Sequence, residues 1–199
     1  GRHFVWTEPL LKAIASGVRA PKRKGPARLF LALHAQSKVE LWDLLQHASP
    51  AALAAAENEH GKQFINLLRT SDGAALEREA IRAFEELAEN HGEASFAGQT
   101  IAEHAKASIY ALRNLRIGNT APEIEGIDIE GKSLKLSDYR GKAVLLTFWA
   151  TWCAPCVSDI PHERELLAKL GGKPFAILGV NIDEDADQAR QVIQREGAS

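Results

Sequence analysis

The chain has 199 residues and a net charge of −2, so its charge provides no electrostatic basis for binding nucleic acid or an anionic membrane. Hydrophobic residues make up 45% and charged residues 25% of the chain, which is typical of a globular protein with one large domain or two small ones. No apolar run approaches the roughly 18 residues that cross a bilayer. Because the sequence begins with Gly1 and contains no methionine, we expect its natural start to lie upstream.

The first 115 residues show a helical pattern. The segment 19–28 is basic and contains two prolines, which favours a solvated loop between helices over a phosphate- or membrane-binding patch. Ser49 before Pro50 predicts a helix start, and Thr100 with Glu103 predicts a capping box. Apolar residues recur at helical spacing over residues 1–17, 29–33, 41–45, 64–68, 74–90 and 101–115. A polar break separates 29–33 from 41–45.

This half of the chain contains no catalytic motif. Trp6 and Trp42 are isolated apolar residues, which favours core positions over a binding groove. His34, His47 and His60 do not share a helical face as metal ligands would, so we expect them at the surface or at helix caps. The buried stripe of the last helix is expected to run from Ile101 to Leu115. We therefore predict that residues 1–115 form a helical region of unknown function.

The pattern changes after residues 118–122. Strand–helix–strand–helix order in the last part of the chain predicts an α/β layer with a parallel strand pair. Gly197 lies where a C-cap glycine would end the last helix. The expected elements are a hairpin over 127–136, a helical turn at 137–139, doubly buried strands over 143–149 and 175–183, and helices over about 153–170 and 186–196.

The two cysteines of the chain, Cys153 and Cys156, follow the apolar strand at the expected turn into a helix. Unpaired N–H groups and the helix dipole favour a thiolate at the first cysteine. A free cysteine with a pKa near ~8.5 is a few per cent ionised at neutral pH, and a pKa of about 7 makes it roughly half ionised. The second cysteine lies one turn further, where it can attack a mixed disulfide. The spacing therefore predicts a dithiol–disulfide switch, with Cys153 as nucleophile and Cys156 as resolving cysteine.

The residues around this pair have simple physical roles. Pro155 rigidifies the helix start and removes a backbone donor that would be unpaired there. Trp152 either covers the sulfur of Cys153 or packs locally, and both residues are candidates for substrate binding. A structural zinc site needs four ligands, and the sequence has neither a second cysteine pair nor closely spaced histidines. We therefore expect no metal and no cofactor.

The segment FWATWCAPC resembles the active site of thioredoxin-like proteins. The longer frame of Ala121-Pro122, GKSLKLSDYRGKAVLLTFWATWCAPC, Pro161 and GVNID is similar to the TlpA/ResA branch of thiol–disulfide oxidoreductases. The segment PHERELLAKLGGKPFAILGVNID is similar to planctomycete-type proteins that carry such a domain behind a helical segment. The resemblance implies an α/β fold class, with an all-helical region over 1–115 followed by a thioredoxin-like domain over 116–199.

The resemblance also implies roles for single residues. Asp159 lies three residues after Cys156, where TlpA/ResA-like proteins usually carry an acid that assists proton transfer. Thr147 stands where thioredoxins have a buried aspartate. The strand that carries the cis-proline of this fold would lie after Ser199, so we expect the domain to lack its last strands and helix here. The strand over 143–149 would then be an unpaired apolar edge. We therefore expect the 199-residue chain to be aggregation-prone or partly unfolded, and a poor catalyst.

The resemblance implies protein disulfides or dithiols as substrates, an upstream redox partner, and an extracytoplasmic location with a membrane tether outside the given sequence. Two alternatives remain. An AhpC/TSA-type peroxiredoxin shares the fold, but Leu146 and Ala150 occupy the proline and threonine positions of its P-x-x-x-T-x-x-C motif. The other alternative is a non-enzymatic helical binding module with an attached redox domain.

Overall fold

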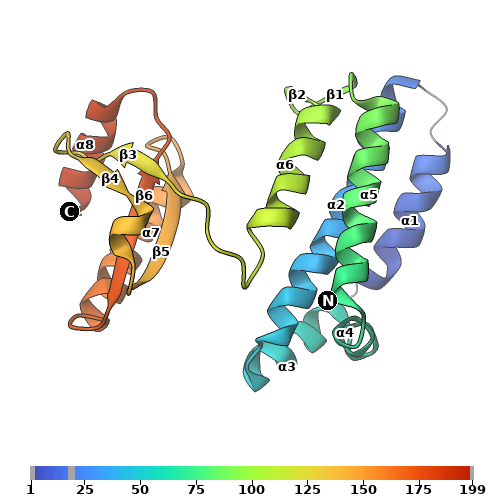
Figure 1. Ribbon diagram of the computed structural model, residues 1–199, viewed down its shortest axis with the longest axis horizontal. Coiled ribbons are helices and arrows are strands. Elements are labelled where there is room, and N and C mark those ends of the chain that lie inside the picture. Colours follow the sequence, from blue (N-terminus) through green and yellow to red (C-terminus); the bar gives the residue numbers. More distant parts are fainter. Residues whose placement is uncertain (1–2, 18–20, 198–199) are drawn as a thin grey trace. The chain divides into compact units, whose positions relative to one another are not determined.

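The computed structural model describes the backbone of residues 3–17 and 21–197 and the side chains of residues 8–17 and 24–197. It divides into two compact units, one ending at Pro122 and one beginning at Glu123 (Figure 1). In the described residues, no helix is both long enough and apolar enough to cross a membrane.

The first unit is a set of packed helices. Helices α2, α5 and α6 lie side by side, and α1 packs against α2 (Figure 1). Their facing apolar stripes form one core around the fully buried Phe84, and a smaller core lies where α3 and α4 meet α2. The helices are α1 (His3–Gly17), α2 (Pro21–Gln46), α3 (Pro50–His60), α4 (Lys62–Arg69), α5 (Gly73–His91) and α6 (Ile101–Asn114).

Several local predictions for this unit are confirmed. Ser49 caps α3 by accepting the N–H of Ala52, with Pro50 in the first turn. Thr100 and Glu103 form the predicted capping box of α6. Trp42 packs into the smaller core, and its indole N–H donates to the carbonyl oxygen of Ser71 at 3.1 Å. The side chain of Trp6 lies outside the described residues.

The prediction of a basic loop and a polar break is wrong, because α2 is one continuous helix from Pro21 to Gln46. Gly25 is buried, and a Cβ added there would lie 3.0 Å from that of Ala94, so close packing stabilises the segment as helix despite its prolines. Further along, Ala35 and Val39 are both buried and lie four residues apart. The apolar face therefore continues through the polar segment.

Two side chains and one short hairpin also differ from expectation. The side chain of His34 is only 9% exposed and lies beside Glu8, with 3.6 Å between Nε2 and Oε2, because α1 covers this part of α2. Leu115 is 59% exposed, since α6 ends at Asn114 before the buried stripe reaches it. A short hairpin of β1 (Ser95–Phe96) and β2 (Gln99–Thr100) interrupts the helical region. Its turn residues, Ala97 and Gly98, both have positive φ, and alanine gives little signal for such a turn.

The second unit has the predicted order of strands and helices. Strands β3 (Glu125–Ile127) and β4 (Ser133–Lys135) form an antiparallel hairpin as expected, but the first strand ends at Ile127, where the sequence pattern placed its beginning. The 3₁₀ turn η1 (Leu136–Tyr139) follows. Strands β5 (Ala143–Trp149) and β6 (Phe175–Asn181) form the expected parallel pair, connected by α7 (Ala154–Lys169). Helix α8 (Ala186–Glu196) ends at Gly197, which is left-handed with a φ of 62° as predicted for a C-cap glycine.

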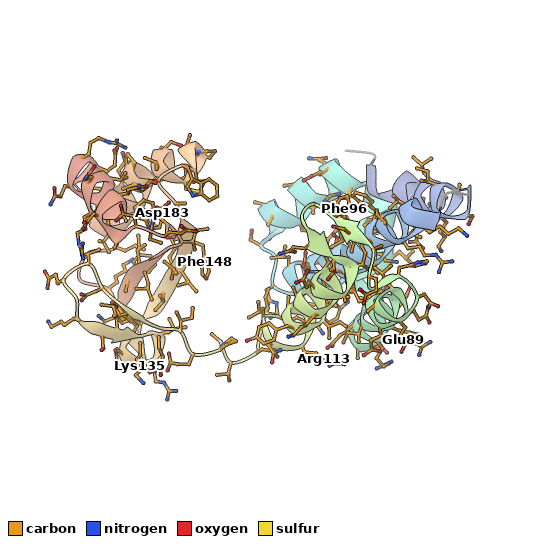
Figure 2. The ribbon with its side chains drawn as sticks, turned by 90° about the horizontal axis from the view of Figure 1, so that it is seen from above. Glu89, Phe96, Arg113, Lys135, Phe148 and Asp183 are labelled. Carbon is orange, nitrogen blue, oxygen red and sulfur yellow. A yellow bond between two sulfur atoms is a disulfide. The ribbon has the colours of Figure 1, made fainter. Side chains whose placement is uncertain are left out.

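The prediction that β5 is buried on both faces is wrong. Leu145 and Phe148 lie three positions apart, on opposite faces of the strand, and are 36% and 59% exposed. Phe148 is labelled in Figure 2. Within the described part of the chain, β5 pairs with β6 alone, so its other edge has no strand beside it. Strand β6 is also mostly half-buried, with Leu178 as its buried residue. A strand buried in the middle of a sheet has partner strands on both edges and cover on both faces. In the described residues, β5 has one partner strand and is partly exposed.

Candidate active site

The turn between β5 and α7 places the two cysteines. Strand β5 ends at Trp149, and the next residue, Ala150, is buried. The N–H of Cys153 donates to the carbonyl oxygen of Ala150 at 3.1 Å and closes a tight turn. Cys153 is the N-cap of α7, and Pro155 lies in the first turn of the helix. The predicted strand–turn–helix is thereby confirmed.

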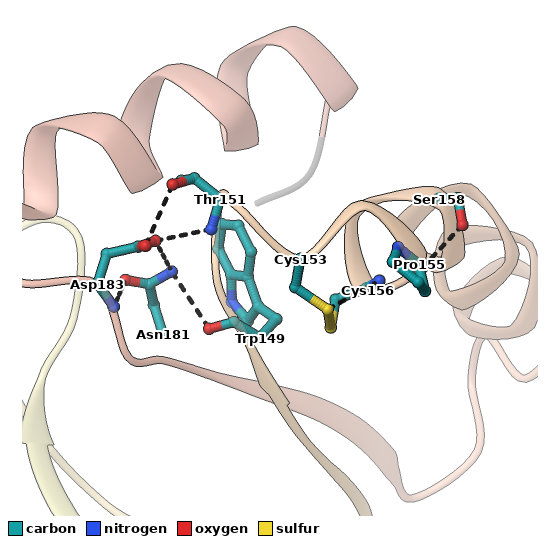
Figure 3. The surroundings of a disulfide bond; sticks show 8 residues. All are labelled: Trp149, Thr151, Cys153, Pro155, Cys156, Ser158, Asn181 and Asp183. Atoms are coloured by element: carbon teal, nitrogen blue, oxygen red, sulfur yellow. Dashed lines mark hydrogen bonds between the residues drawn. A yellow bond between two sulfur atoms is a disulfide. The ribbon is translucent and has the colours of Figure 1, made fainter. Parts of the chain in front are cut away.

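Cys153 and Cys156 form a disulfide, with 5.3 Å between their Cα atoms (Figure 3). The Sγ of Cys153 accepts the N–H of Cys156 at 3.4 Å. A helix N-terminus presents N–H groups that lack partners within the helix, and such groups stabilise a thiolate. The geometry therefore allows Cys153 to carry negative charge when the disulfide is reduced.

The other predicted site residues lie around the disulfide at the surface. Trp152 is 74% exposed. Pro155 and Asp159 are exposed on the first turns of α7, while both cysteines are half-buried. The hydroxyl of Ser158 donates to the carbonyl oxygen of Pro155 at 2.7 Å, which adds one bond to the start of the helix. The disulfide thus lies at an accessible helix end, with a large apolar side chain next to it in sequence.

Sequence reasoning missed a polar network next to this turn. Asp183 follows β6, and its carboxylate accepts the backbone N–H of Thr151 at 2.8 Å and the hydroxyl of Thr151 at 3.1 Å (Figure 3). Hydrogen bonds from the side chain of Asn181 and from Thr151 hold the pKa of Asp183 below its ordinary value. A usable signal was present, because residues after the carboxyl ends of neighbouring parallel strands meet at one edge of the sheet.

Metal ligands do not gather in the described residues, since no group of three or more His, Cys, Asp or Glu side chains is placed to hold an ion. His34, one of the histidines considered above as a metal ligand, lies in the first unit beside the carboxylate of Glu8.

Comparison with known proteins concerns the second unit. Residues 117–198 match the AhpC/TSA family. The thiol-disulfide oxidoreductase ResA of Geobacillus thermodenitrificans is 40% identical over 81 residues, which cover 41% of this chain and 47% of the relative. ResA of Bacillus thuringiensis subsp. konkukian is 41% identical over 70 residues, which cover 35% of this chain and 40% of the relative. The chain thus spans less than half the length of these relatives.

Among solved structures, the thioredoxin domain of a thiol-disulfide oxidoreductase from Bacteroides vulgatus is 33% identical, with a TM-score of 0.40. The match covers 41% of this chain and 58% of that chain. The sequence similarity confirms the expected resemblance to ResA-type proteins for this part of the chain.

Proposed function

We propose that this protein, whose residues 117–198 form a thioredoxin-like domain of the AhpC/TSA family, is a thiol–disulfide oxidoreductase that acts on protein disulfides. The observation that carries the proposal is the disulfide between Cys153 and Cys156 at the N-terminus of α7. Two cysteines that close a disulfide within one helical turn can pass between dithiol and disulfide without rearranging the fold. The named relatives, which share this part of the sequence, support the same activity.

The proposed reaction has two exchange steps. The Cys153 thiolate attacks one sulfur of a substrate disulfide, forms a mixed disulfide, and releases the other substrate sulfur as a thiolate that takes up a proton. The Cys156 thiolate then attacks the Sγ of Cys153 and releases the second substrate thiol. The protein loses two electrons and two protons, and the substrate disulfide gains them. An external dithiol, as the upstream redox partner, must reduce the Cys153–Cys156 disulfide again.

Three neighbouring residues have proposed parts in this reaction. The exposed Trp152 supplies an apolar surface beside the mixed disulfide, and Pro155 keeps the start of α7 rigid. Asp159 lies on α7 three residues after Cys156, so its carboxylate is a candidate to move the proton that Cys156 loses. The exposure of all three residues leaves room for a bound polypeptide.

We extend the proposal to location and organisation on the strength of the ResA resemblance. The protein acts outside the cytoplasm, with a membrane tether outside residues 1–199. Residues 1–115 form a helical region that serves a separate role, such as binding a partner, and residues 116–199 carry the chemistry. The helical packing of the first unit supports a separate role, because it has its own core.

A peroxidase is the second candidate, because the matched family is AhpC/TSA. The two functions are separated by offering the reduced protein a protein disulfide, such as that of insulin, and hydrogen peroxide in parallel. We expect turnover of the insulin disulfide with a dithiol reductant and loss of this turnover in Cys153→Ser. Rapid peroxide consumption without insulin reduction would contradict the oxidoreductase proposal and support the peroxidase.

A further inference from the structure

The hydrogen-bonded ladder of the sheet ends four residues before Cys153. The last pair of the β5–β6 ladder is Trp149 with Asn181. Beyond it, the N–H of Ile182 donates to the carbonyl oxygen of Trp149 at 3.0 Å, and the two segments then leave the sheet. Between the sheet and the start of α7, the chain is therefore held by contacts of residues 150–152.

Within this segment Ala150 is buried, and Thr151 is held by hydrogen bonds to a side chain outside the segment. Both carboxylate oxygens of Asp183 bind it, one accepting the backbone N–H at 2.8 Å and the other accepting the hydroxyl at 3.1 Å (Figure 3). Trp152, between Thr151 and Cys153, is 74% exposed and adds little burial to fix the segment. A carboxylate that accepts two hydrogen bonds from one residue fixes both its position and its orientation.

Asn181 in turn holds the carboxylate in place. Its side-chain amide donates to Asp183 Oδ2 at 2.8 Å, and its side-chain oxygen accepts the N–H of Asp183 at 3.0 Å. The same amide nitrogen lies 3.5 Å from the carbonyl oxygen of Trp149. The network thus connects the ends of both strands to Thr151, and the donors around Asp183 hold its pKa below the ordinary value, Asn181 having the largest effect.

We propose that Asp183 is a positioning residue for the dithiol, which holds Thr151 and thereby keeps Cys153 at the N-terminus of α7. The inference rests on the proposed function, because it assigns Asp183 a role in the reactivity of Cys153. When Asp183 releases Thr151, the turn from Ala150 to Cys153 loosens and Cys153 spends less time against the N–H groups of α7. The pKa of the Cys153 thiol then rises, since those groups are what favour its thiolate.

A positioning role and a simple charge effect predict opposite results. If Asp183 acted only as a nearby negative charge, Asp183→Asn would lower the pKa of the Cys153 thiol, and Thr151→Val would leave it unchanged. If Asp183 positions the turn, both substitutions raise that pKa, because each removes part of the same attachment. Thr151→Ser keeps the hydroxyl and the N–H, so it should behave like the unsubstituted protein.

The test uses the full chain in a Cys156→Ser background, so that Cys153 is the one thiol present. The rate of iodoacetamide alkylation is measured between pH 5 and 9, with far-UV circular dichroism to check folding. We expect Asp183→Asn and Thr151→Val to slow alkylation near pH 6.5 by about threefold or more, which corresponds to about half a unit of thiol pKa. Glu184→Gln is the matched control, since Glu184 is the adjacent exposed carboxylate.

Unchanged alkylation in Thr151→Val would overturn the inference, and so would faster alkylation in Asp183→Asn. If Asp183→Asn does not fold, the comparison of Thr151→Val with Thr151→Ser decides alone. The readout needs no substrate, so it is separate from the proposed function. If the protein reduces insulin and Asp183→Asn leaves the alkylation profile unchanged, this inference alone is refuted. If Asp183→Asn and Thr151→Val slow alkylation but the protein does not reduce insulin, the proposed function alone is refuted.

Discussion

Arg116 holds three helices of the first unit together, and its removal gives a stability prediction with a defined size. It lies just after α6, and its guanidinium donates two hydrogen bonds of 2.8 Å to the carboxylate of Asp43 on α2 and one to Glu77 on α5. The side chains of Arg116 and Asp43 are 17% and 9% exposed. The hydrogen bonds to Asp43 also raise the pKa of Arg116, so the guanidinium stays charged.

The loss of unfolding free energy in Arg116→Met follows from the carboxylate of Asp43, which the substitution leaves without its charged partner. Asp43 would remain nearly buried without its charged partner, and breaking a buried ion pair on one side costs roughly 3–5 kcal/mol. Because water still reaches Arg116 in part and Glu77 is less buried, we expect the lower end, about 3 kcal/mol. Adding Asp43→Leu to Arg116→Met should recover much of this loss, since it removes the unpaired charge.

Urea unfolding followed by far-UV circular dichroism measures the effect. The matched control is Arg113→Met, because Arg113 on α6 (labelled in Figure 2) also reaches a glutamate of α5. The distance from its Nη2 to Oε1 of Glu85 is 3.2 Å. Its side chain is 56% exposed, so we expect a loss below about 1 kcal/mol. If Arg116→Met costs no more than Arg113→Met, or if Asp43→Leu brings no recovery, the reasoning from burial is refuted.

Three further predictions concern pH, proton transfer and self-association. Hydrogen bonds from Lys12 and Lys38 lower the pKa of Glu8 from 4.5 to about 2, so its stabilisation is complete above pH 4.5 and is lost as the pH falls toward 2. In Glu8→Gln, the loss of unfolding free energy as the pH falls from 4.5 toward 2 should be smaller by about 1 kcal/mol. The same loss in Glu8→Gln and in the unsubstituted protein would contradict this. Asp159→Asn should slow insulin reduction while leaving thermal unfolding unchanged; an unchanged pH–rate profile would make Asp159 a surface carboxylate. Phe148→Lys should reduce association of the 199-residue chain in sedimentation velocity, because Phe148 is 59% exposed on a face of β5, a strand that has one described partner strand. A monomeric unsubstituted chain would contradict the expectation of association.

Local signals in the sequence predicted most elements correctly. The capping box at Thr100, the Ser49 cap and the cysteine pair after an apolar strand each depend on residues close in sequence. Such signals act over one or two turns, so a single sequence contains all of the information needed to recognise them. This is why the turn that carries Cys153 and Cys156 could be predicted from the sequence alone.

The errors have a different origin, because they depend on contacts between distant segments. The basic segment at residues 19–28 has the composition of a loop, yet Gly25 packs against Ala94 and its described part, residues 21–28, is helical. His34 has the polarity of a surface residue, yet α1 covers it. Asp183 follows the end of a strand, and it binds Thr151, thirty-two positions away in sequence. The packing of Gly25 and the burial of His34 are not encoded in the spacing of neighbouring residues, so they could not be predicted from it. The Asp183–Thr151 contact could have been expected from the parallel order of the two strands, but the spacing of neighbouring residues alone does not show it.

The most direct test of the proposed chemistry is to trap the intermediate. Cys156→Ser should form a stable mixed disulfide between Cys153 and a substrate disulfide, because the resolving thiol is absent, and Cys153→Ser should form none. Non-reducing electrophoresis and mass spectrometry of the adduct identify the sulfur that is joined. An adduct at Cys153 in Cys156→Ser alone is the predicted result. An adduct at Cys156 in Cys153→Ser, with none at Cys153, would contradict the assignment of nucleophile and resolving cysteine.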